Sequence, residues 1–176
     1  MAIDAVEQKG GLAESTQAKL ISKGSYAAID KWIAKYPAEN RQAALIPALH
    51  IVQDANKGFL TTTLMDELAH YLGIPEIAVY EVASFYSMFE HKPVGRHKIS
   101  VCTNISCMLL GSEEIVEHLK KKFGIKLGQT TADGKFTIKE VECLGACVGA
   151  PMCLIDRDYH EHLTPEKIDA ILEKLD

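Results

Sequence analysis

From residue 25 onward, apolar residues recur with the period of an α-helix through the rest of the first half of the chain, which predicts an all-helical segment. Capping and stop signals place its four expected helices at residues 25–36, 41–56, 63–72 and 76–89. Pro47 falls within the second range, so either this helix is kinked there or its regular part begins later. Apolar side chains cover most of the fourth helix, which indicates burial or an interface.

Local signals set the ends of these helices. Ser25 is expected to cap the first helix, and Pro37 follows its end. Thr63 and Asp66 have the spacing of a capping box for the third helix, and Gly73 is a natural C-terminal stop.

The pattern changes after residue 95, where strand-like alternation begins. We expect a strand, a helix, a hairpin, a strand and a helix, at residues 97–102, 112–123, 130–137, 152–156 and 164–175. The hairpin is predicted by Asp133-Gly134, a dipeptide that favours a two-residue turn. Strands are therefore expected only in the second half of the chain.

This change of pattern divides the chain near residues 91–96. We expect an α+β protein with three segments. A mobile N-terminal arm covers residues 1–24, a helical domain covers residues 25–92, and an α/β domain covers residues 93–176.

Composition and charge exclude several classes of protein. The 176 residues are 47% hydrophobic and 24% charged, close to the average of soluble globular proteins. A net charge of −5 argues against general nucleic-acid binding, which needs a basic face. No apolar run approaches the roughly 20 residues of a membrane span. Residues 1–10 resemble neither a secretory signal nor a mitochondrial presequence, so we expect a cytoplasmic protein without direct membrane insertion, or a mature protein that has already been processed.

The candidate chemistry lies in the cysteines, all of which follow residue 101. Cys102-x4-Cys107 and Cys143-x3-Cys147 form two close pairs, each on a turn at the end of an expected strand, so they can converge on one point. Four thiolates that converge need a cation to hold them. A fifth cysteine and a reducing cytosol argue against structural disulfides.

Three kinds of centre compete for these thiols. Structural zinc tolerates both spacings, although the tight C-x2-C knuckle is absent. A redox dithiol of the thioredoxin type needs a C-x-x-C at a helix start, which neither pair provides. A [2Fe–2S] cluster needs four thiolates and suits wider loops. The small or apolar residues at 144–146 and 148–150 favour this third centre, because they let backbone N–H groups approach the sulfurs.

Several motifs make the sequence recognisable as a family member. It resembles the thioredoxin-like [2Fe–2S] subunit of respiratory complex I, the NADH:quinone oxidoreductase, and the related small subunits of NAD-linked hydrogenases and formate dehydrogenases. In the second half the matching stretches are CTNISC (102–107), GSEE (111–114), GQTTADGKF (128–136), CLGAC (143–147), APM (150–152) and residues 159–166. In the first half they are YLGIP (71–75), FYS (85–87) and PVGRH (93–97).

The resemblance, which covers about residues 25–176, implies a cofactor, a fold and a role. It implies that Cys102, Cys107, Cys143 and Cys147 ligate one [2Fe–2S] cluster in a thioredoxin-like domain that follows a helical bundle. The role is that of an electron-transfer subunit of NADH:quinone oxidoreductase, a translocase, with no complete active site in this chain alone.

The resemblance also implies partners. These are a flavoprotein that carries FMN, binds NADH and holds a [4Fe–4S] cluster, and further subunits in the peripheral arm of a membrane-attached complex. The cluster of this chain would exchange single electrons with that FMN. The same subunit of a soluble NAD-linked hydrogenase or formate dehydrogenase is the alternative. A stand-alone thioredoxin-like ferredoxin lacks the helical extension, and a zinc-stabilised interaction module stays open.

Other conspicuous residues have simpler interpretations. Cys153 matches no ligand position of the motif and is interpreted as a buried structural thiol. His91 and His97 flank the expected junction, where they could contact a partner. The aromatic face of residues 80–89 is expected in the core or against a neighbouring domain, and Lys120–Lys122 at a solvated helix end. No glycine-rich phosphate loop follows a strand, so no NADH or flavin site is expected here.

Overall fold

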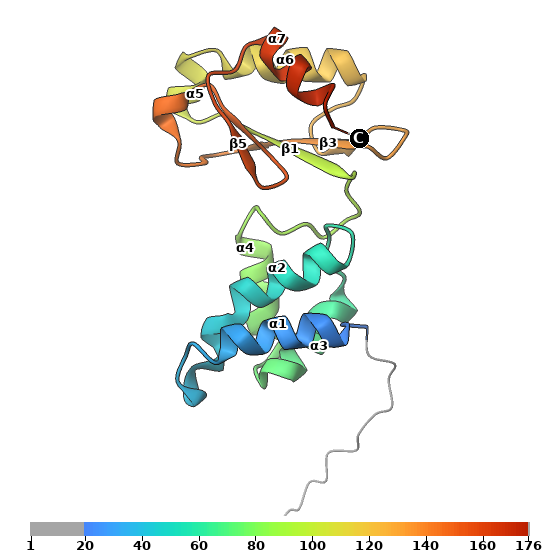
Figure 1. Cartoon of the computed structure of the whole chain (residues 1–176), viewed down its shortest axis with the longest axis vertical. Coiled ribbons are helices and arrows are strands. Elements are labelled where there is room, and N and C mark those ends of the chain that lie inside the picture. The colour runs from blue at the N-terminus through green and yellow to red at the C-terminus, as the bar shows by residue number, and fades with distance from the viewer. Residues whose placement is uncertain (1–19, 176) are drawn as a thin grey trace, which may run out of the picture.

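The computed structural model describes residues 20–175 and shows helices first, then a mixed sheet with its own helices (Figure 1). The helical part contains α1 (Lys23–Ile33), the 3-10 helix η1 (Ala38–Ala44), α2 (Leu45–Ala55), α3 (Thr62–Leu72) and α4 (Glu76–Phe85). The second part contains, in order, β1 (His97–Cys102), α5 (Ile105–Leu109), α6 (Ser112–Phe123), β2 (Gln129–Thr130), β3 (Phe136–Val141), the 3-10 helix η2 (Cys147–Gly149), β4 (Cys153–Ile155), β5 (Asp158–His160) and α7 (Pro165–Leu172). This arrangement agrees with the expected α+β class.

The first helix begins earlier than the sequence predicted. Ser22, not Ser25, is its N-cap, because the Ser22 side chain accepts the backbone N–H of Ser25 at 3.0 Å. Ile21 before the cap is buried, and its N–H donates to the carboxylate of Glu67 at 3.2 Å. The packed part of the chain therefore starts before residue 25. The expectations for residues 1–19 lie outside the described residues.

Two other helices also begin at residues that differ from the predicted ones. The side chain of Thr61 accepts the N–H of Leu64 at 3.2 Å, so Thr61, not Thr63, caps α3. The regular part of α2 begins at Leu45, which resolves the alternative posed by Pro47. The proline lies in the first turn, where its missing N–H leaves no intrahelical hydrogen bond unmade.

The last helix of this part ends earlier than predicted and is buried on one side. Its buried residues are Val79 and Ala83, whereas Ile77 is 61% and Phe85 is 79% exposed. Phe89, which the sequence placed in this helix, lies beyond its end and packs into the core of the helical part. The apolar surface of α4 is thus divided between the core and an exposed face.

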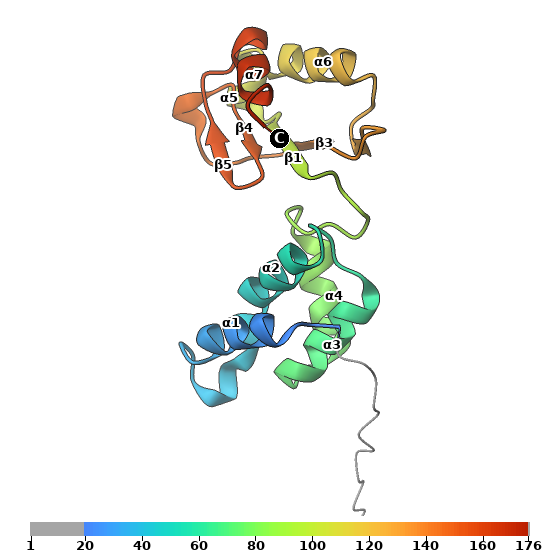
Figure 2. The ribbon, with the colours of Figure 1, turned by 45° about the vertical axis from the view of Figure 1, so that its right-hand side comes forward.

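A five-stranded sheet in the order β2-β3-β1-β4-β5 organises the second part. β1 is central, parallel to β3 and antiparallel to β4. Ile99 and Val101 of β1 pack against α6 and α7, while the alternate residues Lys98 and Ser100 line a cavity on the other side. The views agree, with α6 and α7 on one face of the sheet and the helical part beyond the other (Figure 2). The sequence did not predict α5 or β5.

Each part has its own apolar core. One cluster gathers buried residues between Ile21 and Phe89, and a second gathers buried residues between Ile99 and Leu172. Within residues 20–175, no helix is both long and apolar enough to cross a lipid bilayer.

Charged side chains join the two parts. The carboxylate of Glu90 accepts hydrogen bonds from Lys98 Nζ at 2.9 Å and Lys139 Nζ at 2.7 Å, and all three side chains are at most 20% exposed. Arg157, in the turn between β4 and β5, pairs with Asp54 of α2. Asp54, Lys98 and Arg157 line a cavity of about 860 Å³ between the helical part and the sheet.

Candidate metal centre

The first cysteine pair lies at the end of the central strand. Cys102 is the last residue of β1, and Cys107 belongs to the short helix α5, which begins after the cap Asn104. Both thiols are buried, and Cys102 Sγ donates to the backbone carbonyl of Glu142 at 3.7 Å. Burial, and secondarily the neighbouring thiol of Cys102, raises the pKa of Cys107 to about 11. Thiols ligate a metal only after they lose their proton.

The second pair follows β3, with Cys143 in a loop and Cys147 at the start of η2, and both residues are exposed. Because β1 and β3 are parallel and Cys102 is in register with Val141, both strands end at the same edge of the sheet. Cys143 and Cys147 follow directly from that edge. The N–H of Gly145 donates to Cys143 Sγ at 3.4 Å. Gly145 has a φ of 77°, a left-handed conformation that glycine adopts without the Cβ penalty of other residues.

Two hydrogen bonds fix this loop to β5 and to the segment that follows β5. The Tyr159 hydroxyl of β5 donates to the Leu144 carbonyl at 3.0 Å. The Gly149 carbonyl accepts the N–H of His162 at 2.6 Å. A Cβ at position 149 would lie only 2.4–2.6 Å from side-chain carbons of Glu161, so this close packing needs glycine.

Apolar atoms surround the thiols. Ala150 and Met152 are buried in one cluster with Cys102 and Cys107, and Leu144 packs against it. Large apolar side chains around the loops are exposed, namely Ile105, Met108, Leu109, Leu110 and Val148. The centre thus has a low-polarity interior and an apolar rim.

The donor set fits a two-iron cluster in kind and number. Cys102 and Cys107 belong to one buried cluster, and Ala146, the residue before Cys147, packs against it. Among the described residues, no three His, Cys, Asp or Glu side chains are gathered closely enough for one metal ion. A [2Fe–2S] cluster has two irons and four thiolate ligands, which two separate pairs at one edge can supply. The four-cysteine ligand set, with Cys143 included, stays a prediction.

The remaining candidates are buried or make contacts within the chain. Cys153 is fully buried in β4, and burial raises its pKa to about 12, so the structure confirms a buried thiol. His97 Nδ1 lies 2.7 Å from a carboxylate oxygen of Asp156, and His91 Nε2 lies 3.0 Å from the carbonyl of Ala83.

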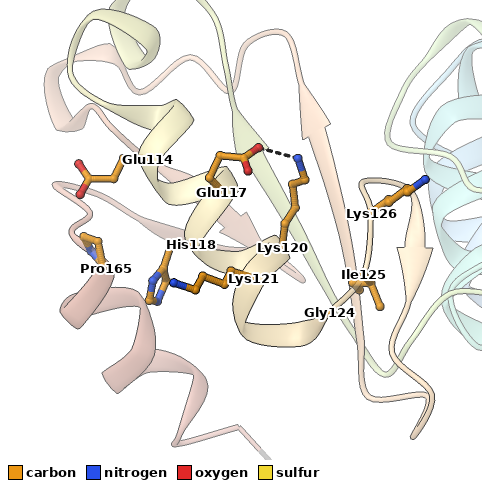
Figure 3. A pocket seen from close by; sticks show the side chains of 9 residues that line it. All are labelled: Glu114, Glu117, His118, Lys120, Lys121, Gly124, Ile125, Lys126 and Pro165. Carbon is orange, nitrogen blue, oxygen red and sulfur yellow. Dashed lines mark hydrogen bonds and ion pairs between the residues drawn. The ribbon is translucent and has the colours of Figure 1, made fainter.

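A surface depression of about 650 Å³ lies along α6 and the start of α7 (Figure 3). Its lining is Glu114, Glu117, His118, Lys120, Lys121, Gly124, Ile125, Lys126 and Pro165. Lys120 pairs with Glu117 at 2.5 Å, and Lys122 nearby pairs with Asp169 at 3.0 Å. The lysine run is therefore partly paired as well as solvated, and this depression is separate from the thiols.

The segment that carries Cys143 and Cys147, between the end of β3 and Gly149, is called the thiol loop. The sequence did not reveal the residues that anchor it. Tyr159 and Glu161 reach it only because β5 pairs with β4, and the sequence predicted no separate strand there. The one available signal was that Tyr159 begins a stretch of the family resemblance, without indicating a role.

Comparison with known proteins places the chain in a family. The family described as thioredoxin-like [2Fe-2S] ferredoxin matches residues 29–176, which include the whole sheet and most of the helical part. The chain belongs to the thioredoxin-like [2Fe-2S] ferredoxin family. The resemblance inferred from the sequence motifs is confirmed.

Relatives in this family carry informative names. A protein of Rickettsia bellii that is named as a subunit of NADH-quinone oxidoreductase is 48% identical over 143 residues, which are 81% of this chain and 86% of that protein. NADH dehydrogenase [ubiquinone] flavoprotein 2, mitochondrial, of Dictyostelium discoideum is 47% identical over 147 residues. That match covers 84% of this chain but only 60% of the Dictyostelium protein.

A solved structure shows the same fold within a longer chain. It is the NAD+-reducing [NiFe]-hydrogenase in the air-oxidized state, which superposes with a TM-score of 0.62 at 29% identity. The match covers 74% of this chain and 22% of the hydrogenase chain.

Proposed function

We propose that this chain is an electron-transfer subunit of an NADH:quinone oxidoreductase, and that Cys102, Cys107, Cys143 and Cys147 hold one [2Fe–2S] cluster. The observation that carries the proposal is the delivery of two thiol pairs to one edge of the sheet, in a family named for this cofactor. Relatives named as subunits of NADH-quinone oxidoreductase support the assembly. When bound, the cluster would accept and release single electrons.

The residues of this chain would prepare the site in three ways. The four thiols supply ligands once deprotonated. Met152 and Ala150 exclude water beneath the first pair. The N–H of Gly145 donates to Cys143 Sγ, and such bonds to ligand sulfurs influence the potential of iron–sulfur centres.

We propose a division into a helical domain over residues 25–92 and a thioredoxin-like [2Fe–2S] domain over residues 93–176. Two separate apolar clusters, one for each part, support this division. The contacts of Glu90 with Lys98 and Lys139 would then form part of the domain interface.

The proposed partner is a flavoprotein that carries FMN, binds NADH and holds a [4Fe–4S] cluster, in the peripheral arm of a complex on the cytoplasmic side. The exposed apolar rim supports a partner surface beside the thiols, because Val148 is 97% and Leu109 is 75% exposed. A flavin held against this rim would lie near the proposed cluster.

An equivalent subunit of an NAD-linked hydrogenase is the second candidate, favoured by the fold match to the NAD+-reducing hydrogenase. A formate dehydrogenase assembly would use the same chemistry. Purification of the native complex through a tag on this chain, with identification of the accompanying subunits, distinguishes them. Quinone-reductase subunits support the first candidate, and a nickel–iron or formate-oxidising subunit supports the second.

Electron paramagnetic resonance tests the cluster itself. Anaerobically purified protein, reduced with dithionite, should give an S = 1/2 signal of about one spin per chain. Cys143→Ser should lose most of this signal and the bound iron. Cys153→Ala is the matched control, since it removes a buried thiol outside the ligand set, and it should keep both. A colourless wild-type protein that contains zinc, or a Cys143→Ser variant with a normal signal, would contradict the assignment.

A further inference from the structure

We propose that Tyr159 is a positioning residue that raises the reduction potential of the cluster through the peptide bond between Leu144 and Gly145. This inference rests on the proposed role of Cys143 as a ligand. The Tyr159 hydroxyl donates to a backbone carbonyl and not to a thiol, so its effect would pass through the backbone.

Two hydrogen bonds meet on that one peptide group. The Tyr159 hydroxyl donates to the carbonyl oxygen of Leu144 at 3.0 Å. The N–H of Gly145, on the other side of the same peptide bond, donates to Cys143 Sγ at 3.4 Å. In a trans peptide the C=O and N–H point in opposite directions. The group therefore links the phenol on one side to the sulfur on the other.

Such a chain of bonds has a defined electrostatic consequence. Donation to a carbonyl polarises its amide and strengthens the bond that the amide N–H makes in turn. Reduction adds an electron to the cluster, so negative charge on the ligand sulfurs increases. A stronger donor to Cys143 Sγ therefore stabilises the reduced form more than the oxidised form and raises the potential. The couple involves one electron, and the tyrosine keeps its proton.

The surrounding structure holds both ends of this relay. Tyr159 is paired with Leu154 across β4 and β5, which fixes the direction of its side chain. Gly145 adopts its left-handed φ with open space around its Cβ position, so backbone conformation, not crowding, explains the glycine. This conformation lets the N–H turn back toward the preceding cysteine.

The relay also borders the cavity between the two parts. Cys143, Leu144 and Tyr159 line that cavity together with His50 of α2. Tyr159 is 57% exposed, and the turn before it is held to α2 by the Arg157–Asp54 ion pair. The strand that carries the phenol is thus tied to the helical part of the chain.

The test compares the potential of wild-type and Tyr159→Phe protein in EPR-monitored redox titrations of the full-length holoprotein. Loss of the hydroxyl should leave the spin per chain unchanged and lower the potential. The ratio of reduced to oxidised protein at a fixed potential should fall about two- to tenfold, where tenfold corresponds to 59 mV for one electron. Tyr86→Phe, which removes a hydroxyl at the end of α4, should leave the potential unchanged.

A spectroscopic measurement distinguishes a change in the Gly145 hydrogen bond from a general loss of order around the cluster. After exchange into D2O, the deuteron on the Gly145 nitrogen should couple to the reduced cluster, and Tyr159→Phe should weaken that coupling. Replacement of Tyr159 by 3-fluorotyrosine, a stronger donor, should raise the potential instead. This replacement keeps the test decisive if the phenylalanine variant loses its cluster.

The outcomes distinguish the relay from the function on which it rests. Equal potentials and couplings in the wild type and both Tyr159 variants, with a normal [2Fe–2S] signal, overturn the relay alone. Absence of that signal in the wild-type protein overturns the proposed function and the relay with it. A lower potential in Tyr159→Phe and a higher one with fluorotyrosine support both.

Discussion

At the scale of single residues, Gly149 shows how the absence of a side chain shapes the thiol loop. The stem of Glu161 occupies the place where a Cβ would lie. We expect Gly149→Ala to displace the loop, destabilise the chain by about 1–3 kcal/mol and reduce iron retention. Urea unfolding and iron analysis measure the two effects.

Gly24→Ala is the matched control for that substitution. Gly24 lies in the first turn of α1, and its Cβ would lie 3.7 Å from Ser22 Oγ, an ordinary contact. Its stability should stay the same or rise slightly, because alanine is the better helix former. Equal stability and iron content in both variants would show that Glu161 adapts freely.

His50 links stability to pH. Burial lowers its pKa below the ordinary 6.5, the charges of Arg157 and Lys98 lower it further, and Asp54 partly opposes them. The unfolded chain therefore binds this proton more tightly, and His50 makes stability fall as pH decreases below about 6.5. Urea unfolding between about pH 7 and pH 5 should show a smaller loss of stability in His50→Gln than in wild type. Parallel pH profiles would refute this role.

The candidate ligands could be predicted from the sequence, but the residues that hold the thiol loop in place could not. Cysteine spacing and loop composition indicate the chemistry of Cys102, Cys107, Cys143 and Cys147 because ligand pairs are local in sequence. The contact of Tyr159 with Leu144 joins residues 15 positions apart and depends on strand pairing, which no local pattern encodes.

At the scale of elements, the cap of α3 offers a sharp comparison. Thr61→Ala removes the oxygen that accepts the N–H of Leu64, so we expect a loss of about 1 kcal/mol. Thr63→Ala changes the residue that the sequence suggested as the cap, and should not lose this amount. Chemical denaturation of the two variants measures the difference, and a reversed order would restore Thr63 as the cap.

Elements with a clear period of apolar residues were predicted well. Elements that are very short, or whose ends depend on tertiary contacts, were not. The strand at His97–Cys102 and the helix at Ser112–Phe123 match their expected ranges, because alternation and amphipathicity are strong there. α5 has five residues, too few for a helical period to show. α4 continued to look helical in sequence past Phe85, although tertiary contacts place Phe89 in the core beyond the helix.

At the scale of the whole molecule, Glu90 holds the helical part to the sheet. Glu90→Gln leaves Lys98 and Lys139 without their common carboxylate in a partly buried place, so we expect a loss of about 1–3 kcal/mol. Glu117→Gln breaks an exposed pair with Lys120 and should cost less than about 0.5 kcal/mol. Urea unfolding at low and high salt measures both, and equal losses would argue against a special role for Glu90.

The α+β class and the place of the pattern change could be predicted, but the order of strands could not. A change from a period of 3.6 to a period of 2 is visible in any window of sequence. That β1 lies between β3 and β4 follows from packing among distant segments. The same limit applies to the cavity between the two parts, which strand and helix faces create only when assembled.

The central position of β1 in the sheet affects the order in which the chain can fold during synthesis. Both of its neighbours, β3 and β4, come later in the chain, so β1 leaves the ribosome before either can pair with it. The helical part makes its contacts among earlier residues and can fold while synthesis continues. Cys102 and Cys107 are therefore synthesised well before Cys143 and Cys147. A nascent chain must keep its first two thiols reduced and unengaged until the second pair emerges.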